Sequence, residues 1–242
     1  MSEESKAVEG EAVIAFEGVV KRLGGRTILD GLTFSVRKGE IFAIVGPSGT
    51  GKSVTLKHIV GLLEPDEGRV ACASRRIGYL FQSGALLAWL TVYENVALPL
   101  VETTRLSGRE VDARVMDALR AVGLEDAADQ YPAEISGGMQ KRAGLARVLV
   151  RDADVILYDE PTSGLDPVTS ASISRLMGNV RDTRGATSVL VTHDIAGALR
   201  LADRIMLLKD GKSVLCATPE EFSASRDPVV MEFLAASKGE GI

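Results

Sequence analysis

The hydrophobic pattern of the first sixty residues predicts strands, a glycine loop and a helix. Residues 12–23 (AVIAFEGVVKRL) and 32–47 (LTFSVRKGEIFAIVGP) are rich in β-branched and aromatic side chains, which favour strands. Within the second segment, EIFAIVG is a short, nearly continuous apolar run, which is typical of a strand buried on both faces of a parallel sheet. Apolar residues then recur at helical spacing from Lys52 onward, so the pattern predicts a strand–loop–helix unit.

The rest of the chain combines a helical middle with further strands. From about 86 to 152 the spacing predicts helices, one of which begins at a capping box of Ser107 with Glu110 and ends at Gly123. Further strands are predicted over 75–82, 153–161 and 187–193, a hairpin over 204–216, and helices starting at Thr218 and Asp227. The whole pattern predicts an α/β core with a helical insertion.

Composition is ordinary for a soluble globular protein with a sizeable core. The chain has 242 residues, enough for one large domain or two small ones, with 45% hydrophobic and 25% charged residues. A net charge of −5 argues against a general nucleic-acid binder, which usually carries a basic patch. Residues 1–12 are polar and acidic-leaning, and we expect them to form a flexible tail.

Cysteine usage and the lack of a long apolar run favour a cytosolic chain. Cys72 and Cys216 have no metal-like spacing, so we interpret them as buried free thiols of a reducing compartment. Glu3 and Glu4 stand where the basic part of a signal peptide would lie, and no segment approaches the roughly 18 apolar residues of a membrane span. We therefore expect any connection to a membrane to run through a partner.

The segment GPSGTGKS carries the most specific chemistry. It fits G-x-x-x-x-G-K-[ST] in full and follows a predicted buried strand. Its glycines leave backbone N–H groups free to wrap phosphates, while Lys52 would reach the β- and γ-phosphates and the Ser53 hydroxyl would ligate Mg²⁺. The predicted phosphate-binding residues are Gly46, Pro47, Ser48, Gly49, Thr50, Gly51, Lys52 and Ser53.

Polar residues at the ends of predicted strands are further candidates. Asp159 closes the apolar run VILYD, where a second contact to Mg²⁺ would belong, and the adjacent Glu160 could polarise an attacking water. His193 and Gln82 also end predicted strands, but a lone histidine there is more often structural and a lone amide is a weak signal. We interpret His58, on the helix after the glycine loop, as structural.

A second helix start with anion-binding character lies in ISGGMQ. Ser136 is a natural cap, and Gly137 and Gly138 leave the first backbone N–H groups of the helix bare. The chain therefore has two candidate phosphate-binding helix starts.

With these residues in order, the chain resembles the ATP-binding subunits of ABC transporters over almost its whole length. GPSGTGKS matches the Walker A motif, Gln82 the Q-loop glutamine, ISGGMQ the signature, VILYDE the Walker B, SGLD with Asp166 the D-loop, and His193 the switch histidine. The resemblance implies an ATPase that uses ATP and Mg²⁺. It implies Glu160, His193 and Gln82 as catalytic residues, and Ser53, Gln82 and Asp159 as the residues nearest the metal.

The resemblance assigns residues 1–242 to a single nucleotide-binding domain. It implies a P-loop NTPase (RecA-like) core with an antiparallel β subdomain, an inserted helical signature subdomain over about 86–152 and a C-terminal helical extension over about 218–242. The last helix has Val230, Phe233 and Leu234 on one face, which could pack on its own chain, on a second copy or on a regulatory partner.

The family resemblance also offers a reason for two phosphate-binding helix starts. Members dimerise head to tail, so Ser136, Gly137 and Gly138 of one chain would cap the γ-phosphate held by the Walker A of the other. Transmembrane permease subunits would dock near Gln82 and residues 85–100. We expect some of residues 85–100 to line a groove for a helix of the permease and the others to pack in the core of the helical subdomain. A small cytosolic regulatory subunit and a lipid-carrier subunit are further implied partners. The implied location is peripheral, on the cytoplasmic face of the bacterial inner membrane.

Departures from the common family pattern point to a subfamily. Met139 replaces the more usual signature glutamine, and QSGALL and TLKHIVGLL add to a resemblance to the Mla- and Mce-type lipid transport ATPases. Movement of phospholipid or another hydrophobic molecule across or between bacterial envelope membranes is therefore expected. The alternatives are transport of a different solute, or a soluble ABC ATPase without membrane partners. Leu23 stands where the family often stacks adenine on an aromatic ring, and Phe16 is the other candidate for that contact.

Overall fold

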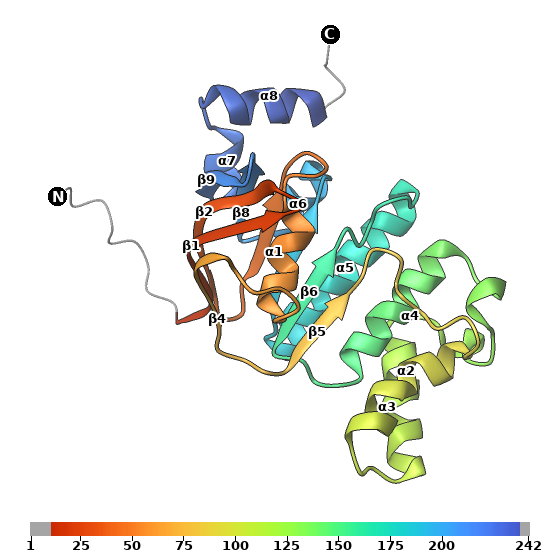
Figure 1. Cartoon of the computed structure of the whole chain (residues 1–242). Helices are drawn as coiled ribbons and strands as arrows, with labels where there is room; N and C mark the ends of the chain where they lie inside the picture. The colour runs from red at the N-terminus through yellow and green to blue at the C-terminus, as the bar shows by residue number, and fades with distance from the viewer. Residues whose placement is uncertain (1–10, 238–242) are drawn as a thin grey trace.

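The computed structural model describes residues 11–237 and is built around two sheets (Figure 1). The expected tail falls outside the described residues except for Glu11 and Ala12, and Ala12 already begins the first strand. The strands are β1 (Ala12–Leu23), β2 (Arg26–Arg37), β3 (Ile41–Val45), β4 (Glu67–Cys72), β5 (Ile77–Leu80), β6 (Val155–Asp159), β7 (Thr187–Thr192), β8 (Arg204–Lys209) and β9 (Lys212–Ala217). The α-helices are α1 (Lys52–Ile59), α2 (Val92–Thr103), α3 (Gly108–Ala121), α4 (Gly137–Leu149), α5 (Pro167–Arg184), α6 (Ile195–Leu201), α7 (Pro219–Ser223) and α8 (Pro228–Ser237).

The larger sheet has the strand order β5-β6-β7-β3-β8-β9. Its first five strands run parallel, and β9 returns antiparallel to β8 through the predicted hairpin. Every residue of β3, β6 and β7 is buried, which confirms that the continuous apolar runs are strands covered on both faces. These three central strands are in register, so their carboxyl ends meet at one edge of the sheet.

The smaller, antiparallel sheet has the order β2-β1-β4 and shares a hydrophobic core with β3 and α1. Phe16, Phe34 and Phe42 form a continuous stack in this core, with successive ring centroids 4.5 and 5.3 Å apart. Because Phe16 is only 1% exposed, the prediction that it could contact adenine is wrong. The alternating pattern of β1 turns this ring inward toward the core.

The helical middle of the chain forms a group of its own, at the lower right of Figure 1. Helices α2, α3 and α4 pack on one another, and two short 3₁₀ turns at Glu125–Ala127 and Pro132–Glu134 lie between α3 and α4. The predicted capping box of Ser107 and Glu110 opens α3, and Gly123, with φ 64°, follows its end. None of the helices within 11–237 is both long enough and apolar enough to cross a bilayer.

The C-terminal helix packs on its own chain. Helix α8 lies against α6 and β9, and Val230 is fully buried there. Phe233 and Leu234 are partly buried against the same core. The apolar face identified in the sequence is therefore covered, at least in part, within the chain itself.

The interpretation of both cysteines as buried thiols is wrong for Cys216. Both cysteines are free, but Cys72 is half-buried and Cys216 is exposed. The reason is the position of β9, which lies at the edge of the six-stranded sheet, next to only one other strand. Sequence spacing cannot show which strand ends a sheet.

His58 is buried on α1 and has one unpartnered nitrogen. Its Nδ1 lies 2.7 Å from the carbonyl oxygen of Val54, whereas Nε2 has no hydrogen-bond partner among the described residues. Burial lowers the pKa of His58 below its ordinary value of 6.5. The unfolded chain therefore takes up a proton near pH 6.5 that the folded chain takes up only at lower pH.

We predict that the free energy of unfolding falls as the pH falls below about 6.5 and that His58→Gln flattens this dependence. A single proton contributes a slope of at most about 1.4 kcal/mol per pH unit. Urea unfolding at pH 7.5 and pH 5.5 measures the slope, with the exposed His193→Gln as the matched control. Equal slopes in wild type and His58→Gln would contradict the prediction.

Candidate functional site

The phosphate loop connects β3 to α1, and two of its glycines have a steric reason. A Cβ at Gly46, where φ is 155°, would collide with the carbonyl oxygen of Leu208. A Cβ at Gly51, where φ is 100°, would lie 2.8 Å from a side-chain carbon of Leu29. The loop therefore runs too close to β2 and β8 for any side chain at these positions. The result is a bare backbone at the start of α1, which is a suitable site for an anion.

Lys52 folds back over the loop that precedes it. Its Nζ donates to the carbonyl oxygens of Gly46 and Pro47, at 2.8 and 2.9 Å, and lies 4.0 Å from Oε1 of Glu160. Burial lowers the pKa of Lys52, and the charges of Glu160 and Asp159 oppose that shift. An ammonium group at the mouth of a glycine loop is placed to meet phosphate oxygens.

Asp159 holds two hydroxyl donors from two different elements. Its Oδ1 accepts from Ser53 Oγ at 2.8 Å, and its Oδ2 accepts from the Tyr79 hydroxyl at 2.9 Å. Burial, together with the charge of Asp159, raises the pKa of Tyr79 well above 10, so the hydroxyl remains a donor. Sequence reasoning missed Tyr79, because only the register, which pairs Tyr79 with Leu157, shows that it lies beside Asp159.

The oxygens of Ser53 and Asp159 suit a magnesium ion. Both are hard donors, and they lie within hydrogen-bond distance of each other at the phosphate loop. The described part of the chain contains no cluster of three or more acidic, histidine or cysteine side chains that could hold a metal alone. This donor set fits Mg²⁺, which commonly takes one or two protein ligands and completes its shell with phosphate and water oxygens.

Glu160 and His193 face each other across the ends of β6 and β7. The Nδ1 of His193 lies 2.8 Å from Glu160 Oε2, and the Glu160 backbone N–H donates to the carbonyl oxygen of Val191 at 2.9 Å. Glu160 has a φ of 50°, a left-handed conformation that is uncommon for a residue other than glycine. Its side chain is only 13% exposed, whereas that of His193 is 58% exposed.

These groups meet in one cavity of about 440 Å³. Its walls combine the phosphate loop with Gln82, Glu160 and His193, and Gln82 is exposed. Leu23, 40% exposed, forms part of an apolar border with Ile28 and Val54. The lining residues are Leu23, Ile28, Ser48, Gly49, Gly51, Lys52, Ser53, Val54, Gln82, Glu160, Ser163 and His193.

The signature turn is not part of this cavity. Ser136 caps α4, because its Oγ accepts from the Met139 N–H at 3.3 Å. A Cβ at Gly138 would lie 2.7 Å from the Thr169 side chain, so α4 begins close against the start of α5. Asp166 caps α5 at the same place by accepting from the Thr169 N–H at 3.0 Å. The structure therefore groups the signature turn with Asp166, outside the cavity that contains Lys52.

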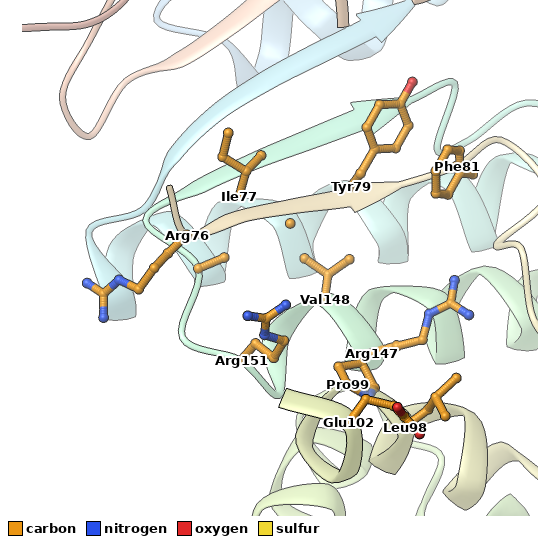
Figure 2. Close-up of a pocket in the computed structure, with 12 residues that line it drawn as sticks. Arg76, Ile77, Tyr79, Phe81, Leu98, Pro99, Glu102, Arg147, Val148 and Arg151 are labelled. Atoms are coloured by element: carbon orange, nitrogen blue, oxygen red, sulfur yellow. The ribbon is translucent and has the colours of Figure 1, made fainter. Parts of the chain in front are cut away.

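A second hollow, of about 420 Å³, lies between β5, α2 and α4 (Figure 2). Tyr79 and Phe81 line one side, Leu98, Pro99 and Glu102 line the other, and Arg147 and Arg151 lie between them. We call this hollow the groove. Its remaining lining residues are Arg76, Ile77, Gly78, Val148 and Ala153.

The chain belongs to the ABC transporter family of ATP-binding proteins. The family model described as ABC transporter matches residues 29–163. Within this family the chain is an ATP-hydrolysing cassette with the P-loop NTPase fold.

Two relatives and one solved structure within this family are similar to the chain over most of its length. The chain is 39% identical over 226 residues to the intermembrane phospholipid transport system ATP-binding protein MlaF of Escherichia coli K12, covering 87% of this chain and 84% of MlaF. It is 39% identical over 236 residues to the probable ribonucleotide transport ATP-binding protein mkl of Mycobacterium leprae, covering 91% of this chain and 68% of mkl. The dimeric, post-hydrolysis ATP-binding cassette MJ0796 bound to ADP and Pi is 35% identical with a TM-score of 0.77, covering 85% of this chain and 98% of MJ0796.

Proposed function

We propose that this chain powers a membrane transporter by closing on ATP as a head-to-tail dimer and reopening after hydrolysis. One observation carries the proposal: the capped, glycine-rich turn at Ser136–Gly138 lies outside the cavity that contains Lys52. A second copy could bring its own turn to that cavity, where the bare N–H groups of α4 would face the γ-phosphate. The dimeric form of the MJ0796 cassette supports this arrangement.

The proposed chemistry is hydrolysis of the γ-phosphate by an oriented water. Glu160 acts as the general base, and His193, 2.8 Å from its Oε2, orients that carboxylate. Gln82 presents its amide to the same cavity from the segment after β5. Ser53, Asp159 and Gln82 are the residues proposed to hold Mg²⁺, which neutralises phosphate charge when bound. Leu23 supplies an apolar contact at the edge of the cavity for the base of ATP.

We further propose that the groove receives a cytosolic helix of a transmembrane subunit. Leu98, Pro99 and Phe81 offer apolar contacts. Arg147 donates to the carbonyl oxygens of Gly84 and Ala85, at 2.9 and 2.7 Å, and Arg151 has no ion pair with any described residue. The groove thus carries more positive than negative charge, which suits a helix with an acidic residue on its apolar face.

Residues 85–100 were expected to divide between a docking groove and the core of the helical subdomain. Leu98 and Pro99 line the groove, whereas Val92 and Val96 are fully buried in the helical core. Trp89 belongs to neither group: it is 72% exposed and does not line the groove. A docking groove of this kind favours a membrane-bound complex over a soluble ABC ATPase without membrane partners.

The proposed cargo is phospholipid or another hydrophobic molecule, moved across or between bacterial envelope membranes. The similarity to MlaF supports this cargo, while the similarity to mkl, a probable ribonucleotide transport protein, keeps a different solute as the alternative. A small cytosolic regulatory subunit and a lipid-carrier subunit complete the proposed complex. The chain would lie on the cytoplasmic face of the inner membrane, attached through its permease subunits.

Glu160→Gln should retain ATP binding while turnover falls by about 100-fold or more, because glutamine keeps the shape and loses the base. Dimers should then accumulate with ATP. Steady-state phosphate release and size-exclusion chromatography measure the two effects, and the exposed Glu125→Gln is the control. Normal hydrolysis in Glu160→Gln would rule out the proposed role.

Mixed dimers test the head-to-tail arrangement. With Lys52→Ala on one chain and Ser136→Arg on its partner, both lesions fall on the same composite site, and one ATP should be occluded per dimer. With both substitutions on one chain, each composite site carries one lesion, and occlusion should fail. Counting bound radiolabelled ATP after rapid gel filtration distinguishes the two. The reverse result would show that Ser136 serves its own chain.

Arg151→Glu should weaken association with the transmembrane subunit by at least about tenfold, because the new carboxylate would repel the acidic residue proposed for the partner helix. ATP binding by the isolated chain should not change. Co-purification with the tagged chain measures association, and Arg109→Glu, an exposed reversal on α3, is the matched control. Equal loss in both variants would argue against docking in the groove.

A further inference from the structure

One side chain, Tyr79, contacts both the groove and the phosphate site. Its hydroxyl donates to Asp159 Oδ2 at 2.9 Å, and Tyr79 is also one of the residues that line the groove. The ring also stacks on Phe81, with centroids 4.2 Å apart and planes inclined by 24°. Figure 2 shows both rings on the β5 segment, with the Tyr79 hydroxyl directed away from the groove.

The hydrogen bond from Tyr79 helps to fix the orientation of the buried Asp159 carboxylate. Asp159 is 8% exposed, and each of its oxygens accepts from a different hydroxyl, Ser53 on one side and Tyr79 on the other. Removing one donor leaves a buried oxygen unpaired and frees the carboxylate to rotate. Groups that orient a metal ligand in this way commonly change metal affinity by 10- to 100-fold.

The ring that stacks on Tyr79 is open to a partner. Phe81 is 39% exposed and lies at the surface of the groove. A contact that shifts the Phe81 ring must also shift the ring stacked on it, and a rigid phenol transmits that shift to its hydroxyl.

We propose that Tyr79 is a positioning residue for Asp159 and that it transmits contacts on Phe81 to the phosphate site. The identity of whatever touches Phe81 rests on the proposed function, but the link from Phe81 through Tyr79 to Asp159 is a property of the isolated chain. It gives the groove a direct route to the carboxylate proposed to hold Mg²⁺.

The test is the magnesium gain of the isolated chain, defined as the nucleotide Kd in EDTA divided by the Kd in Mg²⁺. A fluorescent, non-hydrolysable ATP analogue is the probe. Tyr79→Phe keeps the ring and its stacking and should lower the gain by about tenfold, with the Kd in EDTA unchanged. Tyr93→Phe, which removes a tyrosine hydroxyl from α2 at a residue that lines neither the nucleotide cavity nor the groove, should leave the gain at the wild-type value.

Two results would overturn the positioning role. One is a gain in Tyr79→Phe equal to that of Tyr93→Phe. The other is an equal loss of affinity in EDTA and in Mg²⁺, because a general structural defect weakens nucleotide binding whether or not the metal is present.

A double-mutant cycle tests the link to the groove. Phe81→Ala should also lower the gain, and this effect should vanish when Tyr79→Phe is already present, because both act through the same hydroxyl. Additive effects, or no effect of Phe81→Ala, would overturn the link. No transmembrane subunit is needed, so this outcome is independent of whether Arg151→Glu abolishes docking.

Discussion

The site depends on the register of three parallel strands. Val45 pairs with Thr192, and Asp159 pairs with Val191, so β3, β6 and β7 end at the same level. Both faces of all three strands are covered, so a shift of one residue would send each side chain to the opposite layer and disrupt the close packing on both sides. The glycine loop, Glu160 and His193 each follow one of these strands directly, and Asp159 is the last residue of β6. Their proximity is a consequence of how the core packs.

Within that frame, hydrogen bonds divide the two acidic residues by role. Asp159 points inward, where Ser53 and Tyr79 hold both of its oxygens. Glu160 turns the other way, because its left-handed backbone directs its side chain between Lys52 and His193. Consecutive residues thus face different partners: Asp159 is fixed at the phosphate loop, and Glu160 lies beside the exposed side chain of His193.

Much of this architecture could be predicted from local sequence. The run 12–23 is a strand with the predicted limits, and helices begin after Ser107 and Thr218 as expected. These features depend on residues close together in the chain. The strand order does not, so the exposure of Cys216 was predicted wrongly.

In the candidate site, too, features that depend on neighbouring residues could be predicted, and features that depend on tertiary packing could not. The phosphate loop could be recognised because its glycines and Lys52 are contiguous and each has a chemical reason. Tyr79 could not, because its partner lies 80 residues away in sequence on a neighbouring strand. The groove has the same character: its walls come from β5, α2 and α4, which no local pattern brings together. The roles assigned to Gln82, Glu160 and His193 came from family resemblance, and the structure adds their shared cavity.

The left-handed backbone of Glu160 has a consequence for attempts to engineer the protein. Its φ of 50° is a conformation that glycine adopts without steric cost, whereas a side chain costs about 1 kcal/mol or more there. Selection for thermal stability alone would therefore favour Glu160→Gly, which removes the carboxylate. A laboratory evolution scheme that scores folding without scoring phosphate release would tend to convert this enzyme into a stable nucleotide-binding protein.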